Sequence, residues 1–106
     1  MSVAEVTMSR NGIWLTAILR PAGELAGRSV ERFVDDLVAL AQRANIVVVN
    51  LVAATIPAPA VLANALRRPG AMLSGPDKAL LLVGADDRLL HELELIGGDI
   101  AAVPGA

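Results

Sequence analysis

The segment Ile46–Leu51 (IVVVNL), a continuous apolar run over 46–49 followed by Asn50-Leu51, lies near the middle of the chain. It is rich in β-branched residues and lacks polar alternation, which is typical of a strand covered or flanked on several sides by other elements. Pro57 and Pro59 follow it, and Pro59 suits the first turn of a helix, where its missing N–H group would have no partner. We therefore predict a central strand over 46–51 and a helix over about 59–68. The positions of this helix that we expect to face inward are Val61, Leu62, Ala65 and Leu66.

Two apolar segments at the start of the chain, Val3–Met8 and Ile13–Leu19, are separated by Ser9–Gly12. The pair Asn11-Gly12 between them favours a tight hairpin with a type I′ turn. An amphipathic helix is then expected over about 29–43, with Ser29 as its N-cap. Its apolar positions recur at steps of three and four residues: Val30, Phe33, Val34, Leu37, Val38 and Ala41.

The second half of the chain continues the alternation of helices and strands. Pro69-Gly70 should stop or kink the helix over 59–68, and Ala79–Val83 reads as a second buried strand. Asp86 or Asp87 should cap a further helix that ends at Gly97-Gly98, and residues 100–103 could form a short edge strand. The chain is therefore predicted to be a single α/β domain over 1–106, with a mixed sheet whose later strands are parallel.

Composition excludes several classes of function. The net charge is −2 and only Trp14 and Phe33 are aromatic, so neither phosphate-backbone binding nor base stacking is favoured. There is no cysteine and only one histidine, His91, and no strand is followed by a glycine-rich phosphate loop. We expect no catalytic residue, no metal site and no cofactor, and therefore no enzyme.

The longest uncharged apolar stretch, Leu51–Ala63, is shorter than a membrane span requires and contains two prolines. A soluble, cytoplasmic protein without membrane insertion is the expectation. The adjacent acid pairs Asp35-Asp36 and Asp86-Asp87 are read as surface or capping residues, because neighbouring helical side chains point apart.

Four segments carry a resemblance to a known family: Gly23-Glu24-Leu25 before the first helix, the strand at 46–51, Leu80–Gly84, and Leu89–Gly97. In this order the chain resembles the STAS domains of anti-sigma-factor antagonists and of sulfate-transporter cytoplasmic domains. The resemblance covers nearly the whole chain, and it implies a mixed β-sheet of four to five strands with three to four helices packed on it.

The resemblance also implies a function, that of a non-catalytic regulatory domain that binds another protein. The partner would be an anti-sigma factor or a serine-kinase-like regulator. Two segments would make the contact, the loop from Gly23 to Gly27 and the start of the second helix. The expected partner-binding residues are Gly23, Glu24, Leu25, Ala26, Ala58, Pro59, Ala60, Val61 and Leu62.

The chain departs from the family at the position that family members phosphorylate. Where they have Asp-Ser-Ser-Gly at the start of the second helix, this chain has Ala58–Val61, with Ala60 at the acceptor position. The family's aspartates in the Gly-Glu-Leu-Asp motif and at the strand end are replaced by Ala26 and Asn50. Binding without phosphorylation at the usual position is therefore expected.

Two hydroxyl residues remain open as other sites of modification. Thr55 is the nearest hydroxyl to Ala60, although a threonine at a strand end more often bonds local backbone. Ser74 lies in a Gly/Pro turn, where an ordinary turn serine is the commoner case. Met72 and Leu73, if exposed, would add an apolar spot to the interface.

Two other functions remain alternatives. The aliphatic surplus could be used in a structural subunit or in a homo-oligomeric component of a larger assembly, such as a transporter-associated complex, and a homodimer is one such form. A carrier of a small apolar ligand, held between sheet and helices, is the other.

Overall fold

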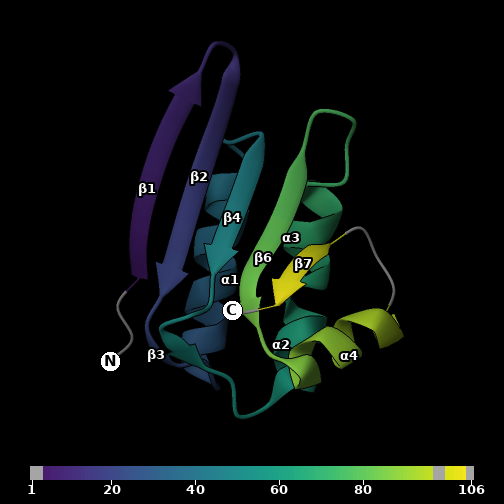
Figure 1. Ribbon diagram of the computed structural model, residues 1–106. Helices are drawn as coiled ribbons and strands as arrows, with labels where there is room; N and C mark the ends of the chain where they lie inside the picture. Colours follow the sequence, from purple (N-terminus) through teal and green to yellow (C-terminus); the bar gives the residue numbers. More distant parts are fainter. Residues whose placement is uncertain (1–3, 97–99, 105–106) are drawn as a thin grey trace.

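The chain folds into a five-stranded mixed sheet with helices packed against one of its faces (Figure 1). The computed structural model describes residues 4–96 and 100–104. In chain order the elements are β1 (Ala4–Asn11), β2 (Trp14–Pro21), β3 (Gly23–Glu24), α1 (Arg28–Ala41), β4 (Ile46–Asn50), β5 (Ala54–Thr55), α2 (Pro59–Ala65), α3 (Arg67–Met72), β6 (Ala79–Ala85), α4 (Asp87–Ile96) and β7 (Ala101–Pro104).

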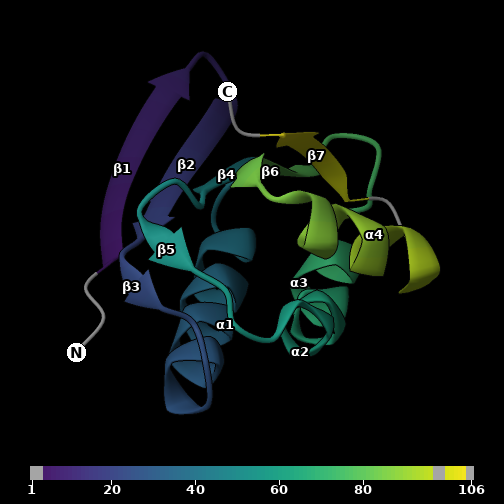
Figure 2. The same ribbon diagram turned by 60° about the horizontal axis from the view of Figure 1, so that its bottom comes forward.

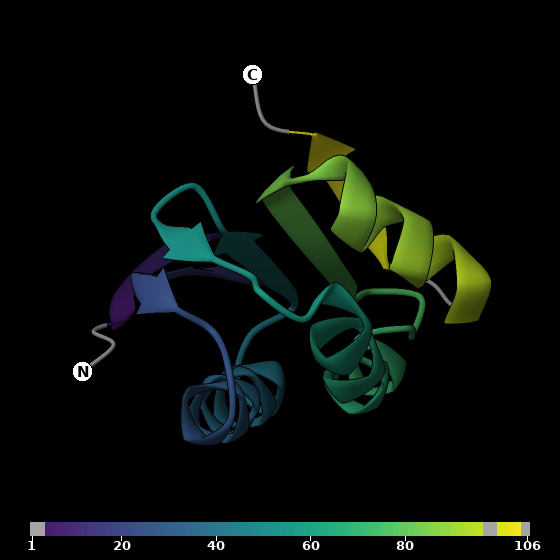
Figure 3. The ribbon, with the colours of Figure 1, turned by 90° about the horizontal axis from the view of Figure 1, so that it is seen from below.

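The order of strands across the sheet is β1-β2-β4-β6-β7. Strand β1 is antiparallel to β2, and every later neighbour is parallel, so the predicted mixed sheet is confirmed. Each crossover from β2 onward advances to the next strand in the same direction. Because such crossovers are right-handed, all of the helices fall on one face of the sheet, and Figures 2 and 3 show α1 to α4 gathered on that side.

The hydrophobic core lies between this face and the helices. Alternate residues of the three inner strands point into it, because side chains along a strand alternate between the two faces. They are Ala17 and Leu19 of β2, Val47 and Val49 of β4, and Leu80 and Leu82 of β6, all fully buried. The helices contribute Leu37, Leu62, Leu66 and Leu89 to the same cluster.

The hairpin between β1 and β2 is present, but its turn differs from the predicted one. Asn11 pairs with Trp14, so the two central residues are Gly12 and Ile13 rather than Asn11 and Gly12. Gly12 has φ of 65° and no non-glycine residue of the described chain has a positive φ. A positive φ at the first central position alone is the pattern of a type II′ turn, which glycine favours there.

The N-cap of the first helix lies two residues before the predicted one. Gly27, with φ of 56°, is the N-cap of α1, and Ser29 is already inside the helix. The Ser29 hydroxyl accepts a hydrogen bond from the Ala26 N–H at 2.8 Å. The serine therefore fixes the loop before the helix instead of capping the helix itself.

The predicted helix over 59–68 is two short helices joined at Leu66. Pro69 and Gly70 lie inside α3 and the interruption falls earlier, at Leu66, so the prediction that they stop or kink the helix was wrong in its position. Pro69 is the third residue of α3, and the N–H groups of a first turn have no helical partners to lose. Gly70 is buried there, and a Cβ atom on it would meet Ile100 Cγ1 at 2.9 Å.

The inward face of α2 is also rotated from the predicted one. Its buried positions are Pro59, Leu62 and Ala63, and Leu66 continues the same stripe. Val61, predicted to face inward, is 55% exposed. Met72 at the end of α3 packs against the core and Leu73, which follows α3, is buried, so these two residues do not form the exposed apolar spot.

Strand β4 is flanked by β2 and β6, as a central strand should be, but helices cover only one of its faces. Its burial alternates, with Val47 and Val49 buried and Ile46, Val48 and Asn50 half-buried. At the other end of the chain, Asp86 caps α4 by accepting the Leu89 N–H at 2.8 Å. The predicted helix end at Gly97-Gly98 lies outside the described residues, and the short last strand is β7.

Replacing Gly84 by alanine should destabilise the protein more than the same change at Gly12. Gly84 has φ of 80°, and an added Cβ atom would meet Val52 Cγ2 at 2.9 Å and the Val52 backbone nitrogen at 3.1 Å. Gly12 has φ of 65° and open space around it. The positive φ costs about 1–2 kcal/mol in both variants, and overpacking adds about 1–3 kcal/mol at Gly84 alone. Urea unfolding of the two variants measures the difference, and equal losses would contradict the close approach of β6 to the loop after β4.

Candidate functional site

The structure joins the two chain segments that precede α1 and α2. Gly23 and Glu24 of β3 pair in parallel with Ala54 and Thr55 of β5. The Gly23 N–H donates to the Ala53 carbonyl at 3.0 Å, and the Leu25 N–H donates to the Thr55 carbonyl at 2.8 Å. This two-stranded ribbon lies at the end of the sheet where the parallel strands β2, β4 and β6 finish (Figure 1). The predicted loop is therefore held against the segment that leads into α2.

Within the loop over 23–27, the predicted residues divide between core and surface. Leu25 is buried in the core, and Ala26 is half-buried. Gly23 and Glu24 are exposed. The Ser29 Oγ atom lies 2.8 Å from the Glu24 carbonyl and can donate its hydrogen there. The loop therefore presents an exposed backbone strand and one carboxylate, anchored by Leu25 and Ser29.

The start of α2 divides in the same way. Pro59 and Leu62 are buried and Ala58 is half-buried, while Ala60 and Val61 are exposed. No side chain in the described part of the chain caps this helix. What reaches solvent at this helix start is therefore one methyl group and one isopropyl group.

The loop between β4 and α2 is held by backbone and amide hydrogen bonds. The Val52 N–H donates to the Asn50 Oδ1 atom at 3.0 Å, and the Leu51 N–H donates to the Val83 carbonyl at 2.8 Å. Asn50, which stands where the resemblance places an aspartate, thus closes a local turn. Thr55 follows in β5 and is exposed.

These residues define one candidate surface, which we call the β3–α2 surface: Gly23, Glu24, Thr55, Ala60 and Val61, all exposed. Figure 1 shows β3 and α2 at the same end of the molecule. Glu24 is its single charge and Thr55 its single hydroxyl. This surface offers a partner apolar contacts and a strand edge with backbone hydrogen-bonding groups. Its five residues do not include a nucleophile in contact with a base, as covalent catalysis requires.

The other candidate residues lie outside the β3–α2 surface. The Ser74 hydroxyl donates to the Ala71 carbonyl at 2.7 Å, which is the bond of an ordinary turn serine. Asp35, Asp36 and His91 are exposed on their helices. Among residues 4–96 and 100–104, no three histidine, cysteine or acidic residues are placed to hold a metal ion. No helix in that part of the chain is long and apolar enough to cross a bilayer.

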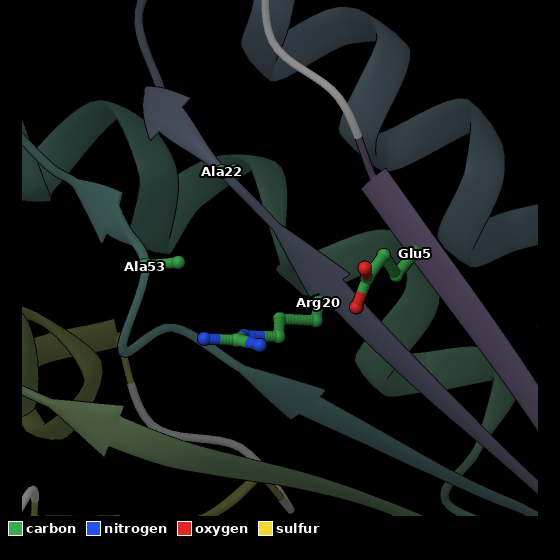
Figure 4. Close-up of a pocket in the computed structure, with 4 residues that line it drawn as sticks. All are labelled: Glu5, Arg20, Ala22 and Ala53. Atoms are coloured by element: carbon green, nitrogen blue, oxygen red, sulfur yellow. The ribbon is translucent and has the colours of Figure 1, made fainter.

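A shallow hollow of about 300 Å³ lies beside the β3–β5 ribbon, lined by Glu5, Arg20, Ala22 and Ala53. In Figure 4 the Arg20 side chain extends toward Ala53, and the Glu5 carboxylate lies on its other side. Sequence patterns did not point to this hollow. The alternation of β2 could have placed Arg20 on the outer face of the sheet, but not opposite Glu5, because strand register is not visible in sequence.

The arrangement of elements is that of a solved anti-sigma-factor antagonist. The structure titled "Structure of the Anti-Sigma Factor Antagonist SpoIIAA in its Unphosphorylated Form" is similar over 96% of this chain and 90% of that one, with a TM-score of 0.65. The chain has the STAS fold. The two sequences are 10% identical, so the similarity concerns the fold. No protein-family model and no curated protein matches the sequence.

Proposed function

We propose that this STAS-fold chain is a non-catalytic regulatory domain of the cytoplasm that binds a protein through its β3–α2 surface. The partner class is an anti-sigma factor or a serine-kinase-like regulator, by analogy with the named activity of the similar antagonist. Because a fold hosts many functions, the proposal depends on the site rather than on the fold alone.

The observation that carries the proposal is the pairing of β3 with β5. It holds the loop over 23–27 against the segment entering α2 and leaves both exposed. Val61 is 55% exposed near the start of α2, the helix that this segment enters. An exposed strand edge is a common element of protein recognition, and an exposed aliphatic side chain adds apolar contact area.

The second part of the proposal concerns regulation. Residues 58–62 contain no hydroxyl, and Pro57 and Pro59 remove two N–H groups that could hold a phosphate. A kinase-like partner could not release itself by modifying this helix start. Binding is therefore constitutive with respect to phosphorylation at Ala60.

A pull-down from the native cytosol with the purified chain tests the proposal. The wild-type chain should retain a protein identified by mass spectrometry as an anti-sigma factor or a serine-kinase-like regulator. Val61→Glu should lower the retained amount at least about tenfold, because a charge would be desolvated at the contact.

Leu95→Glu is the matched control, since Leu95 is 67% exposed on α4, a different element of the fold. Retention should match that of the wild-type chain. Recovery of no protein of this class, or equal loss with both variants, would contradict the proposal.

A further inference from the structure

Within residues 4–96 and 100–104 nothing covers the face of the sheet opposite the helices, and the centre of this face is apolar. Its residues follow from the strand registers and from the alternation with the buried positions. Figure 1 looks onto this face, with α1 and α3 behind the strands. We define the open face by these residues: Glu5, Thr7, Ser9 and Asn11 of β1, Trp14, Thr16, Ile18 and Arg20 of β2, Ile46, Val48 and Asn50 of β4, Ala79, Leu81 and Val83 of β6, and Ala101 of β7.

The centre of the open face is aliphatic. Ile18 pairs in register with Val48, and Val48 with Leu81, so three aliphatic side chains form one row across β2, β4 and β6. Ile18 is 37% exposed, and Val48 and Leu81 are half-buried. Parallel sheets are normally covered on both faces. This sheet has a second aliphatic face and, within the described residues, nothing on it.

The charges on the open face disfavour several classes of binding partner. Glu5 and Arg20 are its only ionisable residues in the described chain, and they lie opposite each other in the β1–β2 register. The face therefore has no net charge, which disfavours nucleic acid, anionic lipid surfaces and strongly charged peptides. A neutral face with an aliphatic centre is compatible with contact between two copies of the same surface.

We infer that the open face is the interface of a reversible homodimer. The two-fold axis of this dimer lies in the plane of the interface and runs across the strands, midway between the positions of Thr16 and Ile18. It sets Trp14 of one copy over Arg20 of the other. Trp14 and Arg20 lie at opposite ends of β2 on the same face, and both are exposed. Indole over guanidinium is a favourable cation–π pair, and the symmetry forms it twice. The same operation sets Ile46 against Val48 and Ala79 against Leu81 of the second copy.

The size of the open face predicts a dimer that dissociates on dilution. Five strands of four to eight residues, about 4.8 Å apart and with about 3.3 Å per residue, give a footprint on the order of 500 Å² per copy. Stable complexes bury about 800 Å² per partner. The dimer therefore depends on concentration, and it goes beyond the proposed function because α2 lies on the other side of the sheet.

Sedimentation equilibrium and fluorescence of the purified full chain test this inference. The weight-average mass should rise from monomer to dimer across the micromolar range. The chain has one tryptophan, Trp14, so its quenching by acrylamide should fall over the same concentrations. Ile18→Glu should remain monomeric at every concentration, with an unchanged circular dichroism spectrum and thermal transition.

A matched pair of arginine variants tests the symmetry. Arg20→Ala should raise the dimer dissociation constant about tenfold or more, because it removes both cation–π contacts. Arg10→Ala should leave it unchanged, because Arg10 pairs with Leu15 and lies on the opposite face of the same hairpin. A folded wild-type chain that stays monomeric to its solubility limit would overturn the inference. So would a dimer that Ile18→Glu leaves intact.

Discussion

Leu62→Ala should lower the free energy of unfolding by about 2–5 kcal/mol, whereas Val61→Ala should change it by less than about 0.5 kcal/mol. The two residues are neighbours in α2, but Leu62 is fully buried and Val61 is 55% exposed. Truncating Leu62 removes buried methyl groups and leaves a cavity that its neighbours fill only in part. Urea unfolding followed by circular dichroism measures both values.

The same pair separates stability from binding. Partner retention by the folded fraction of Leu62→Ala should equal that of the wild-type chain, because the side chain does not reach the surface. Val61→Ala should weaken retention while leaving the unfolding midpoint unchanged. Similar unfolding losses in the two variants would mean that α2 is rotated from the orientation described here.

Ala60→Ser should create a phosphorylation site that the wild-type chain lacks. Ala60 is the second residue of α2 and is exposed, so a serine there would present its hydroxyl at the start of a helix. Incubation with ATP, Mg²⁺ and the captured kinase-like regulator should add the mass of one phosphoryl group to this variant, and none to the wild-type chain.

Ala39→Ser is the control for this experiment, because it places a serine at an exposed position of α1, outside the β3–α2 surface. It should remain unmodified. Phosphorylation of the wild-type chain at Thr55 would contradict the absence of a switch, since Thr55 is the one hydroxyl of that surface.

The long elements of the fold could be predicted because their hydrophobic periods are clear. Ile46–Asn50 and Ala79–Ala85 are strands, and Arg28–Ala41 is a helix, close to the expected bounds. Strands β3 and β5 could not be predicted, because two residues carry no periodicity. Their pairing is long-range, and only the folded chain brings Gly23 beside Ala54.

The outward direction of Val61 was missed for a different reason. Two sets of positions satisfy helical spacing. One set is 61, 62, 65 and 66, and the other is 59, 62, 63 and 66. The side chains of the first set are the more hydrophobic. Burial of Pro59 and Ala63 decides for the second set. The sequence pattern also could not show that helices cover β4 on one face only. A run of aliphatic residues looks the same whether helices cover one face of the strand or something else covers the other face as well.

A titration of the captured regulator with the wild-type chain, with and without ATP and Mg²⁺, tests whether binding is independent of phosphorylation. We expect the dissociation constant to be the same in both conditions, because residues 58–62 offer no hydroxyl to modify. A complex that forms without ATP and dissociates as ATP is consumed, with a phosphoryl group on the chain, would contradict the account.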